Sequence, residues 1–180
     1  DWYFAEHAVL IDTAGRYLTQ PSADIDAAGW SSLLGLLRSR RPRPLNGVLI
    51  NIPAELLLRG SELELESLAR QTRLRLQEIN QRLGADVPVY LVVSKADSIV
   101  GFNEFFDQLS REESDQVLGV SFRKNQDGTD IQVVRGEFET LMQRLNSQVV
   151  MRMHQERDNQ RRGRILDFPL KLGQIEEHLG

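Results

Sequence analysis

Short apolar runs, each ending at turn-forming residues, alternate along this chain with segments of helical periodicity. The clearest run, Ala8–Ile11, ends at the tetrapeptide Asp12-Thr13-Ala14-Gly15. A continuous apolar run bounded by turn residues is typical of a strand that is buried on both faces of a sheet. By this pattern the sequence predicts four strands, at residues 8–12, 47–52, 87–93 and 117–122.

Between the runs, apolar residues recur three and four positions apart and predict helices. The clearest helix spans residues 61–84, where Ser61 and Glu64 have capping-box spacing and Gly84 suits the C-terminal cap. Further helices are predicted from an N-cap at Asp26, around Phe102, from a cap at Ser110 with Glu113, and from near Arg135.

Strands that alternate with helices predict parallel strands joined by crossover helices. We therefore expect an α/β fold with three layers, a mainly parallel sheet between flanking helices, over residues 1–154. Residues 155–164 are almost wholly polar, and an apolar pattern returns only at Ile165. Residues 155–180 are thus predicted to be a linker and the start of a helical extension.

Composition excludes several classes of protein. The 180 residues are 41% hydrophobic and 27% charged, which is ordinary for a soluble globular protein. The absence of cysteine excludes a disulfide framework, a cysteine zinc site and a thiol nucleophile. The net charge of -4 argues against a general nucleic-acid binder. No apolar run reaches the ~18 residues of a membrane-spanning helix, and the first residues do not resemble a signal peptide.

Two tetrapeptides at predicted strand ends have the chemistry of a nucleotide site. In P-loop nucleotide hydrolases, an aspartate placed like Asp12 holds Mg²⁺, and a glycine placed like Gly15 lets the backbone approach the γ-phosphate. Ser94-Lys95-Ala96-Asp97 is similar to the guanine-reading Asn/Thr-Lys-x-Asp motif of GTPases. The predicted nucleotide-binding residues are therefore Asp12 (also the Mg²⁺ ligand), Gly15, Ser94, Lys95 and Asp97. The alternative is that they are turn and cap residues.

The phosphate-binding half of such a site is missing from the chain. A P-loop requires Gly-x-x-x-x-Gly-Lys-Ser/Thr, and none of the three lysines follows a glycine or precedes a serine or threonine. We expect the motif, with its strand, to lie upstream in a longer parent chain, leaving an open slot in the sheet. Arg16 also takes the place of the glutamine that orients water in Ras-like GTPases, and arginine cannot accept a hydrogen bond.

These residues resemble the signature of the IcmF/TssM inner-membrane proteins of type VI secretion systems. The resemblance covers nearly the whole chain. Its blocks are Asp1–Phe4, Ala8–Tyr17, Trp30 with Leu33–Leu37, Arg41-Pro42, Asn46–Leu49, Pro88–Tyr90, Ser94–Asp97, Gly101–Phe106 and Asp167–Pro169.

The resemblance implies a P-loop-NTPase-like (Ras-like) domain on the cytoplasmic face of the bacterial inner membrane, in a larger protein anchored by transmembrane helices. It implies as partners a TssL-type membrane protein, a TssJ-type lipoprotein, baseplate components and further copies of itself. Because some family members lack a P-loop, we expect a scaffold with no cofactor in this chain. The alternative is a switch that hydrolyses GTP or ATP with Mg²⁺, using a P-loop upstream of this chain. Arg16 and the block at 102–106 argue against an unrelated small GTPase.

Other patterns leave two interpretations open. The basic patch is either a solvated turn or a contact for anionic lipid or an acidic partner; it comprises Arg38, Arg40, Arg41 and Arg43. The aromatic stripe is either core or a docking surface; it comprises Phe102, Phe105, Phe106 and Leu109. The three histidines lack the spacing of a shared metal site, and no serine lies in a Gly-x-Ser-x-Gly motif.

Overall fold

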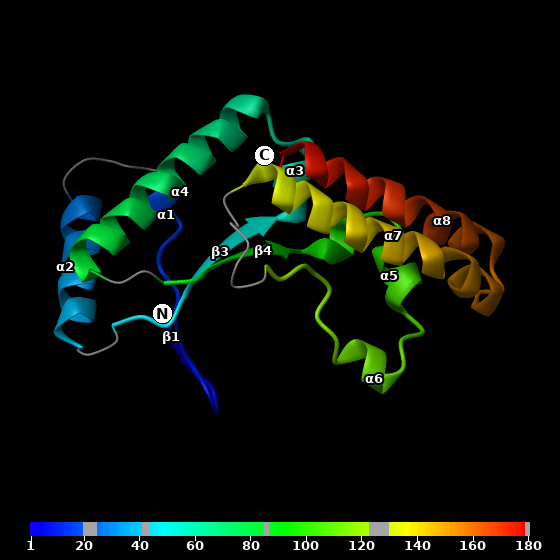
Figure 1. The fold of residues 1–180 in the computed structure, drawn as a ribbon, viewed down its shortest axis with the longest axis horizontal. Coiled ribbons are helices and arrows are strands. Elements are labelled where there is room, and N and C mark those ends of the chain that lie inside the picture. The colour runs from blue at the N-terminus through cyan, green and yellow to red at the C-terminus, as the bar shows by residue number, and fades with distance from the viewer. Residues whose placement is uncertain (20–24, 41–43, 85–86, 123–129, 179–180) are drawn as a thin grey trace. The chain divides into compact units, whose positions relative to one another are not determined.

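The structure is a computed structural model that describes residues 1–19, 25–40, 44–84, 87–122 and 130–178 (Figure 1). These residues form two compact units. Unit 1 comprises residues 1–50 and 61–92, and unit 2 comprises residues 51–60 and 93–180. Each is described by itself below.

Unit 1 joins a small hairpin to a pair of long helices. Strand β1 (Trp2–Phe4) pairs antiparallel with β2 (Val9–Ile11), so that Tyr3 lies opposite Leu10. A short helix α1 (Arg16–Thr19) follows, and then α2 (Ile25–Ser39) and α4 (Glu62–Leu83). The core lies where α2 meets α4 and is formed by Trp30, Leu34, Leu37 and Ile79.

The ends of α4 agree with the sequence prediction. The Ser61 hydroxyl accepts from the backbone N–H of Glu64, and the Glu64 carboxylate accepts from the backbone N–H of Ser61 at 2.9 Å. Gly84 ends the helix in the left-handed conformation, with φ of 62°. The predicted N-cap of α2 is wrong, because Asp26 lies within the first turn of the helix (Ile25–Ser39).

Two strands form a second small sheet. Strand β3 (Val48–Pro53) pairs with β4 (Val89–Ser94), and the backbone N–H of Val48 donates to the carbonyl oxygen of Pro88 at 2.9 Å. Since the two strands meet at their starting residues, they run in the same direction (Figure 1).

Unit 2 is helical and packs around phenylalanine side chains. Its elements are α3 (Ala54–Arg59), the 3₁₀ turn η1 (Ala96–Ser98), α5 (Phe102–Phe106), α6 (Arg111–Ser114), α7 (Ile131–Gln155), α8 (Asn159–Gly173) and the 3₁₀ turn η2 (Gln174–His178). Phe105 and Phe168 are fully buried, with ring centroids 5.0 Å apart. Phe102 and Phe106 also pack on the Phe168 ring. The structure therefore places Phe105 in the core.

Gly101 lets α5 approach α8 closely. Its φ of 88° is left-handed, which glycine adopts without a steric penalty. A Cβ atom at this position would lie 2.9 Å from the carbonyl carbon of Arg164 and 2.9 Å from the Cβ of Phe168. The absence of a side chain at Gly101 thus permits the packing of the aromatic core.

The predicted three-layer, P-loop-NTPase-like parallel sheet is wrong. The described residues are mostly helical, with two sheets of two strands each. The apolar run at 8–12 pairs with β1 in a hairpin, and the runs at 47–52 and 87–93 pair with each other. Residues 117–122 form no strand, and Val117 is 92% exposed. An apolar run indicates a segment that favours burial, but a strand also requires a neighbouring strand to pair with its backbone N–H and C=O groups.

Candidate functional site

Asp12 and Gly15 lie in the turn that leads from β2 into α1, in unit 1. The backbone N–H of Asp12 donates to the carbonyl oxygen of Asp1 at 2.9 Å, which continues the hairpin. The backbone N–H of Leu18 donates to the carbonyl oxygen of Gly15 at 2.9 Å, and this bond begins α1. The Asp12 side chain is exposed. Among the described residues, no group of three or more histidines or carboxylates is arranged to hold a metal ion.

A partly buried cluster on α2 and α4, formed by Trp30, Arg75 and Glu78, contacts the backbone of α1 at Tyr17. The Nε of Arg75 donates to the carbonyl oxygen of Tyr17 at 2.9 Å, and its Nη1 donates to Glu78 at 2.9 Å. The guanidinium lies 5.4 Å from the ring centroid of Trp30, whose indole N–H donates to Glu78 at 2.5 Å. The sequence patterns described above do not predict this cluster. The available signal was an Arg–Glu pair three residues apart beside the apolar stripe of a helix.

Ser94 is the last residue of β4, and Lys95 and Asp97 lie in the turn that follows it; all three belong to unit 2. Lys95 has φ of 53° and ψ of 37°, a left-handed conformation that costs a non-glycine residue about 1–2 kcal/mol. The turn is closed by backbone bonds from Ser98 to Lys95 at 3.0 Å and from Ile99 to Ala96 at 3.0 Å. The buried Ile99 side chain anchors it, while Lys95 and Asp97 are exposed.

The five predicted nucleotide-binding residues are thus divided between the two units. Asp12 and Gly15 belong to unit 1, and Ser94, Lys95 and Asp97 belong to unit 2. Nucleotide binding by these residues, and Mg²⁺ binding by Asp12, stay predictions.

The predicted basic patch is described in part. Arg38 lies in the last turn of α2, Arg40 follows the helix, and both side chains are exposed. Arg41 and Arg43 lie outside the described residues. Contact with lipid or with an acidic partner stays a prediction for this patch.

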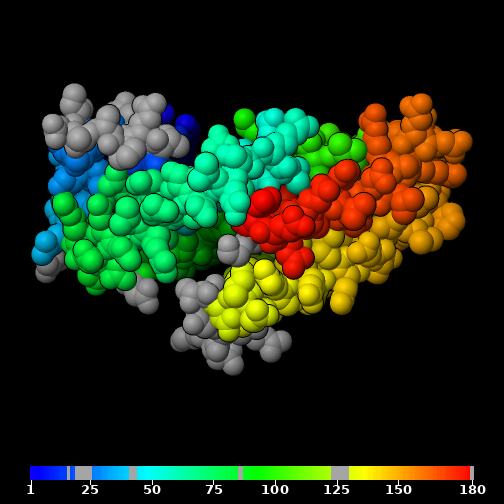
Figure 2. All heavy atoms as spheres, turned by 90° about the horizontal axis from the view of Figure 1, so that it is seen from above, coloured from blue at the N-terminus to red at the C-terminus, as the bar shows by residue number. Residues whose placement is uncertain are grey.

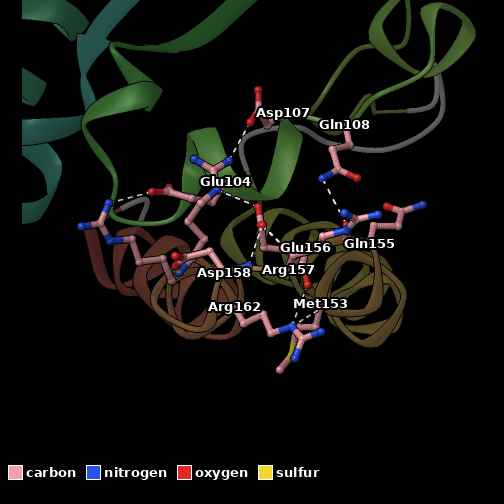
Figure 3. A network of polar contacts seen from close by, with 11 residues as sticks. Glu104, Asp107, Gln108, Met153, Gln155, Glu156, Arg157, Asp158 and Arg162 are labelled. Carbon is pink, nitrogen blue, oxygen red and sulfur yellow. Dashed lines mark hydrogen bonds and ion pairs between the residues drawn. The ribbon is translucent and has the colours of Figure 1, made fainter.

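A polar network joins α5 to the corner between α7 and α8 (Figure 3). The Glu156 carboxylate accepts from the backbone N–H of Asp158 at 3.0 Å and from Nε of Arg161 at 2.7 Å. Hydrogen bonds from the Asp158 N–H, which has the larger effect, and from the Arg161 guanidinium lower the pKa of Glu156 to about 2. Arg161 also pairs with Asp107 at 2.6 Å, just after α5.

Two further arginines complete this corner. Arg164 on α8 pairs with Glu104 on α5 at 2.7 Å, and its guanidinium lowers the pKa of Glu104. The Nε of Arg162 donates to the carbonyl oxygens of Met153 at 3.1 Å and Glu156 at 2.7 Å. It thereby satisfies acceptors that the end of α7 leaves without helical partners.

Arg152 connects α7 to α6 and is buried, with 3% of its surface exposed. Its Nη2 donates to Glu113 at 2.7 Å, and Glu113 also caps α6 by accepting from the backbone N–H of Ser110 at 2.8 Å. Since these arginines are bonded to neighbouring helices, their evident effect is to fix α5–α8 relative to one another.

Comparisons with known proteins establish the family. Within the described ranges, every helix is too short or too polar to cross a bilayer. The model of the IcmF-related N-terminal domain matches residues 23–180. The chain is 44% identical over 186 aligned residues to the type VI secretion system component TssM1 of Pseudomonas aeruginosa, an alignment that takes in all of this chain and 17% of that protein. No solved structure matches the chain. The chain therefore belongs to the IcmF/TssM family.

Proposed function

We propose that this chain is a structural part of a type VI secretion membrane complex and works through contacts with other proteins. The observation that carries the proposal is the similarity to TssM1, which extends over the whole chain at 44% identity. Because the chain spans 17% of that protein, the proposal concerns one piece of a larger subunit.

The family also suggests where the piece works and what it contacts. We propose a location on the cytoplasmic face of the inner membrane. The proposed partners are a TssL-type membrane protein, baseplate components and other copies of the same subunit. The net charge of -4 supports protein partners over nucleic acid.

The exposed hairpin of unit 1 supports a role in protein contacts. Phe4 is 79% exposed, and Tyr3, Val9 and Leu10 are also exposed. A two-stranded hairpin is marginally stable alone in water, and aromatic residues are enriched in protein interfaces. Cover from another protein surface would stabilise this hairpin.

Nucleotide hydrolysis is not part of the proposal. The chain contains no Gly-x-x-x-x-Gly-Lys-Ser/Thr motif to hold phosphates. The parallel sheet on which the comparison with GTPases depended is also not the arrangement of the described residues.

The proposal is tested in bacteria that carry the full-length subunit. Asp12→Asn with Asp97→Asn changes two exposed carboxylates of the predicted nucleotide site, and Phe4→Asp changes the hairpin. Glu6→Gln, in the hairpin loop, is the matched control. We expect secretion and copurification with membrane-complex proteins to persist in the Asp12/Asp97 variant and in the control, and to fall for Phe4→Asp. Loss of secretion in the Asp12/Asp97 variant, at unchanged protein level, would contradict the proposal.

A further inference from the structure

The outer face of α7 and α8 carries a groove that the packing of these helices leaves open. It has a volume of about 430 Å³ and is lined by α7 on one side and by α8 with η2 on the other. Figure 2 shows α8, in orange and red, beside α7, in yellow. Met142, Leu166 and Leu170 give the groove apolar walls, and Asn146 and Glu177 are polar members of its lining.

The leucines of the groove are not needed for the core of unit 2. Ile165 and Phe168, on the other side of α8, are buried and form that core. Leu166 is 56% exposed and Leu170 is 70% exposed, and their spacing of four residues places them on one side of the helix. A helix that is apolar on two sides, with one of them uncovered, indicates a contact surface.

The charges at one end of the groove are acidic. Gly173 lies against Met142, with 3.6 Å from its ideal Cβ position to the Met142 methyl, so η2 passes the residues that precede Met142 on α7. Glu177 lies in the lining of the groove, and Glu139 is an exposed residue of α7 one turn before Met142, just beyond the lining. Neither carboxylate makes an ion pair within the described part of the chain. Of the basic residues nearby in sequence, Arg135 on α7 is a further turn before Glu139, and Lys171 on α8 follows Leu170.

We propose that this groove binds an amphipathic helix of a partner protein, with aliphatic side chains against Leu166, Leu170 and Met142 and a lysine or arginine against Glu139 and Glu177. A helix-in-groove contact uses apolar anchors three and four residues apart, and Leu166 and Leu170 of the groove have the same spacing on α8. The inference deepens the proposed function by giving the chemistry of one partner, and it rests on the proposal that the chain acts through protein contacts.

The test is isothermal titration calorimetry of the full 180-residue chain with two designed helical peptides of about five turns. One peptide has a leucine face and lysines elsewhere, and the other replaces the lysines by glutamates. We expect binding of the leucine–lysine peptide. Leu170→Glu should weaken it by about tenfold or more, because it removes a buried apolar contact. Glu177→Lys should weaken it by about two- to fivefold, as expected for a surface charge pair.

The matched control is Leu63→Glu, which changes a leucine that is 78% exposed on α4 and should leave the affinity unchanged. Leu170→Glu also separates the groove from non-specific attraction, because an added carboxylate would strengthen a purely electrostatic interaction with lysines. Equal binding of both peptides, tighter binding by Leu170→Glu, or an equal loss in Leu63→Glu would overturn the proposal. A dimer of the chain that Leu170→Glu dissociates would also overturn it, by identifying a second copy as the occupant. These outcomes are independent of the secretion assay.

Discussion

Replacing Gly101 by alanine should destabilise unit 2 for two separable reasons. The left-handed backbone, with φ of 88°, costs an L-residue about 1–2 kcal/mol. The new methyl group would also overlap the carbonyl oxygen of Arg164 and crowd the Cβ of Phe168. Forcing such a contact apart typically costs about 1–3 kcal/mol. We therefore expect the free energy of unfolding to fall by about 2–5 kcal/mol.

Urea denaturation followed by far-UV circular dichroism measures this loss. Gly163→Ala, within α8, is the control, because nothing lies within 4 Å of its Cβ position; it should stabilise the helix by about 0.5–1 kcal/mol. Gly101→Asn separates the two costs, since asparagine tolerates positive φ but carries the same Cβ. If Gly101→Ala unfolded at the urea concentration of the parent protein, the close approach of α5 to α8 would be refuted.

Three further predictions concern the core, the corner network and nucleotide. Phe105→Ala should cost about 3–5 kcal/mol, because the ring is fully buried; an unchanged melting temperature would instead indicate a docking surface. Glu156 has a pKa of about 2 in the folded chain against an ordinary 4.5, so its stabilisation is present above pH 4.5 and is lost as the pH falls toward 2. Glu156→Gln should flatten that part of the pH–stability curve measured with urea, and an unchanged slope would contradict the network. The chain should bind GTP or ATP no tighter than millimolar and hydrolyse neither, because it lacks the P-loop groups that hold phosphates. Calorimetry showing Mg²⁺-dependent micromolar binding would refute this.

Structural features that depend on only a few neighbouring residues agree with the sequence prediction. The capping boxes at Ser61 and Ser110 depend on a partner three positions away, and both form. The apolar pattern predicts the start of α7 near Arg135, but the helix begins four residues earlier, at Ile131. The signal missed there was Asp130, whose side chain accepts from the backbone N–H of Gln132.

The sheet and the corner network depend on contacts between distant residues, which local patterns do not specify. The run Val117–Phe122 has the composition of a strand, yet it has no partner strand among the described residues. The polar segment 155–164 lies in the stretch 155–180 for which the sequence predicts a linker and the start of a helical extension, but no local pattern indicates that α8 begins as early as Asn159. Which carboxylate each arginine meets depends on the approach of α5, and the sequence does not encode that approach in any short motif.

The division of aromatic residues between the units has a spectroscopic consequence. Both tryptophans and all three tyrosines lie in unit 1, whereas the aromatic residues of unit 2 are all phenylalanines. The intrinsic fluorescence of the protein therefore arises from unit 1, and Trp30, which contacts Arg75 and Glu78, should change its emission when that unit opens. Amide dichroism reports on the helices of both units. An unlabelled sample can thus reveal whether the two units unfold together, since coincident transitions mark a single cooperative event.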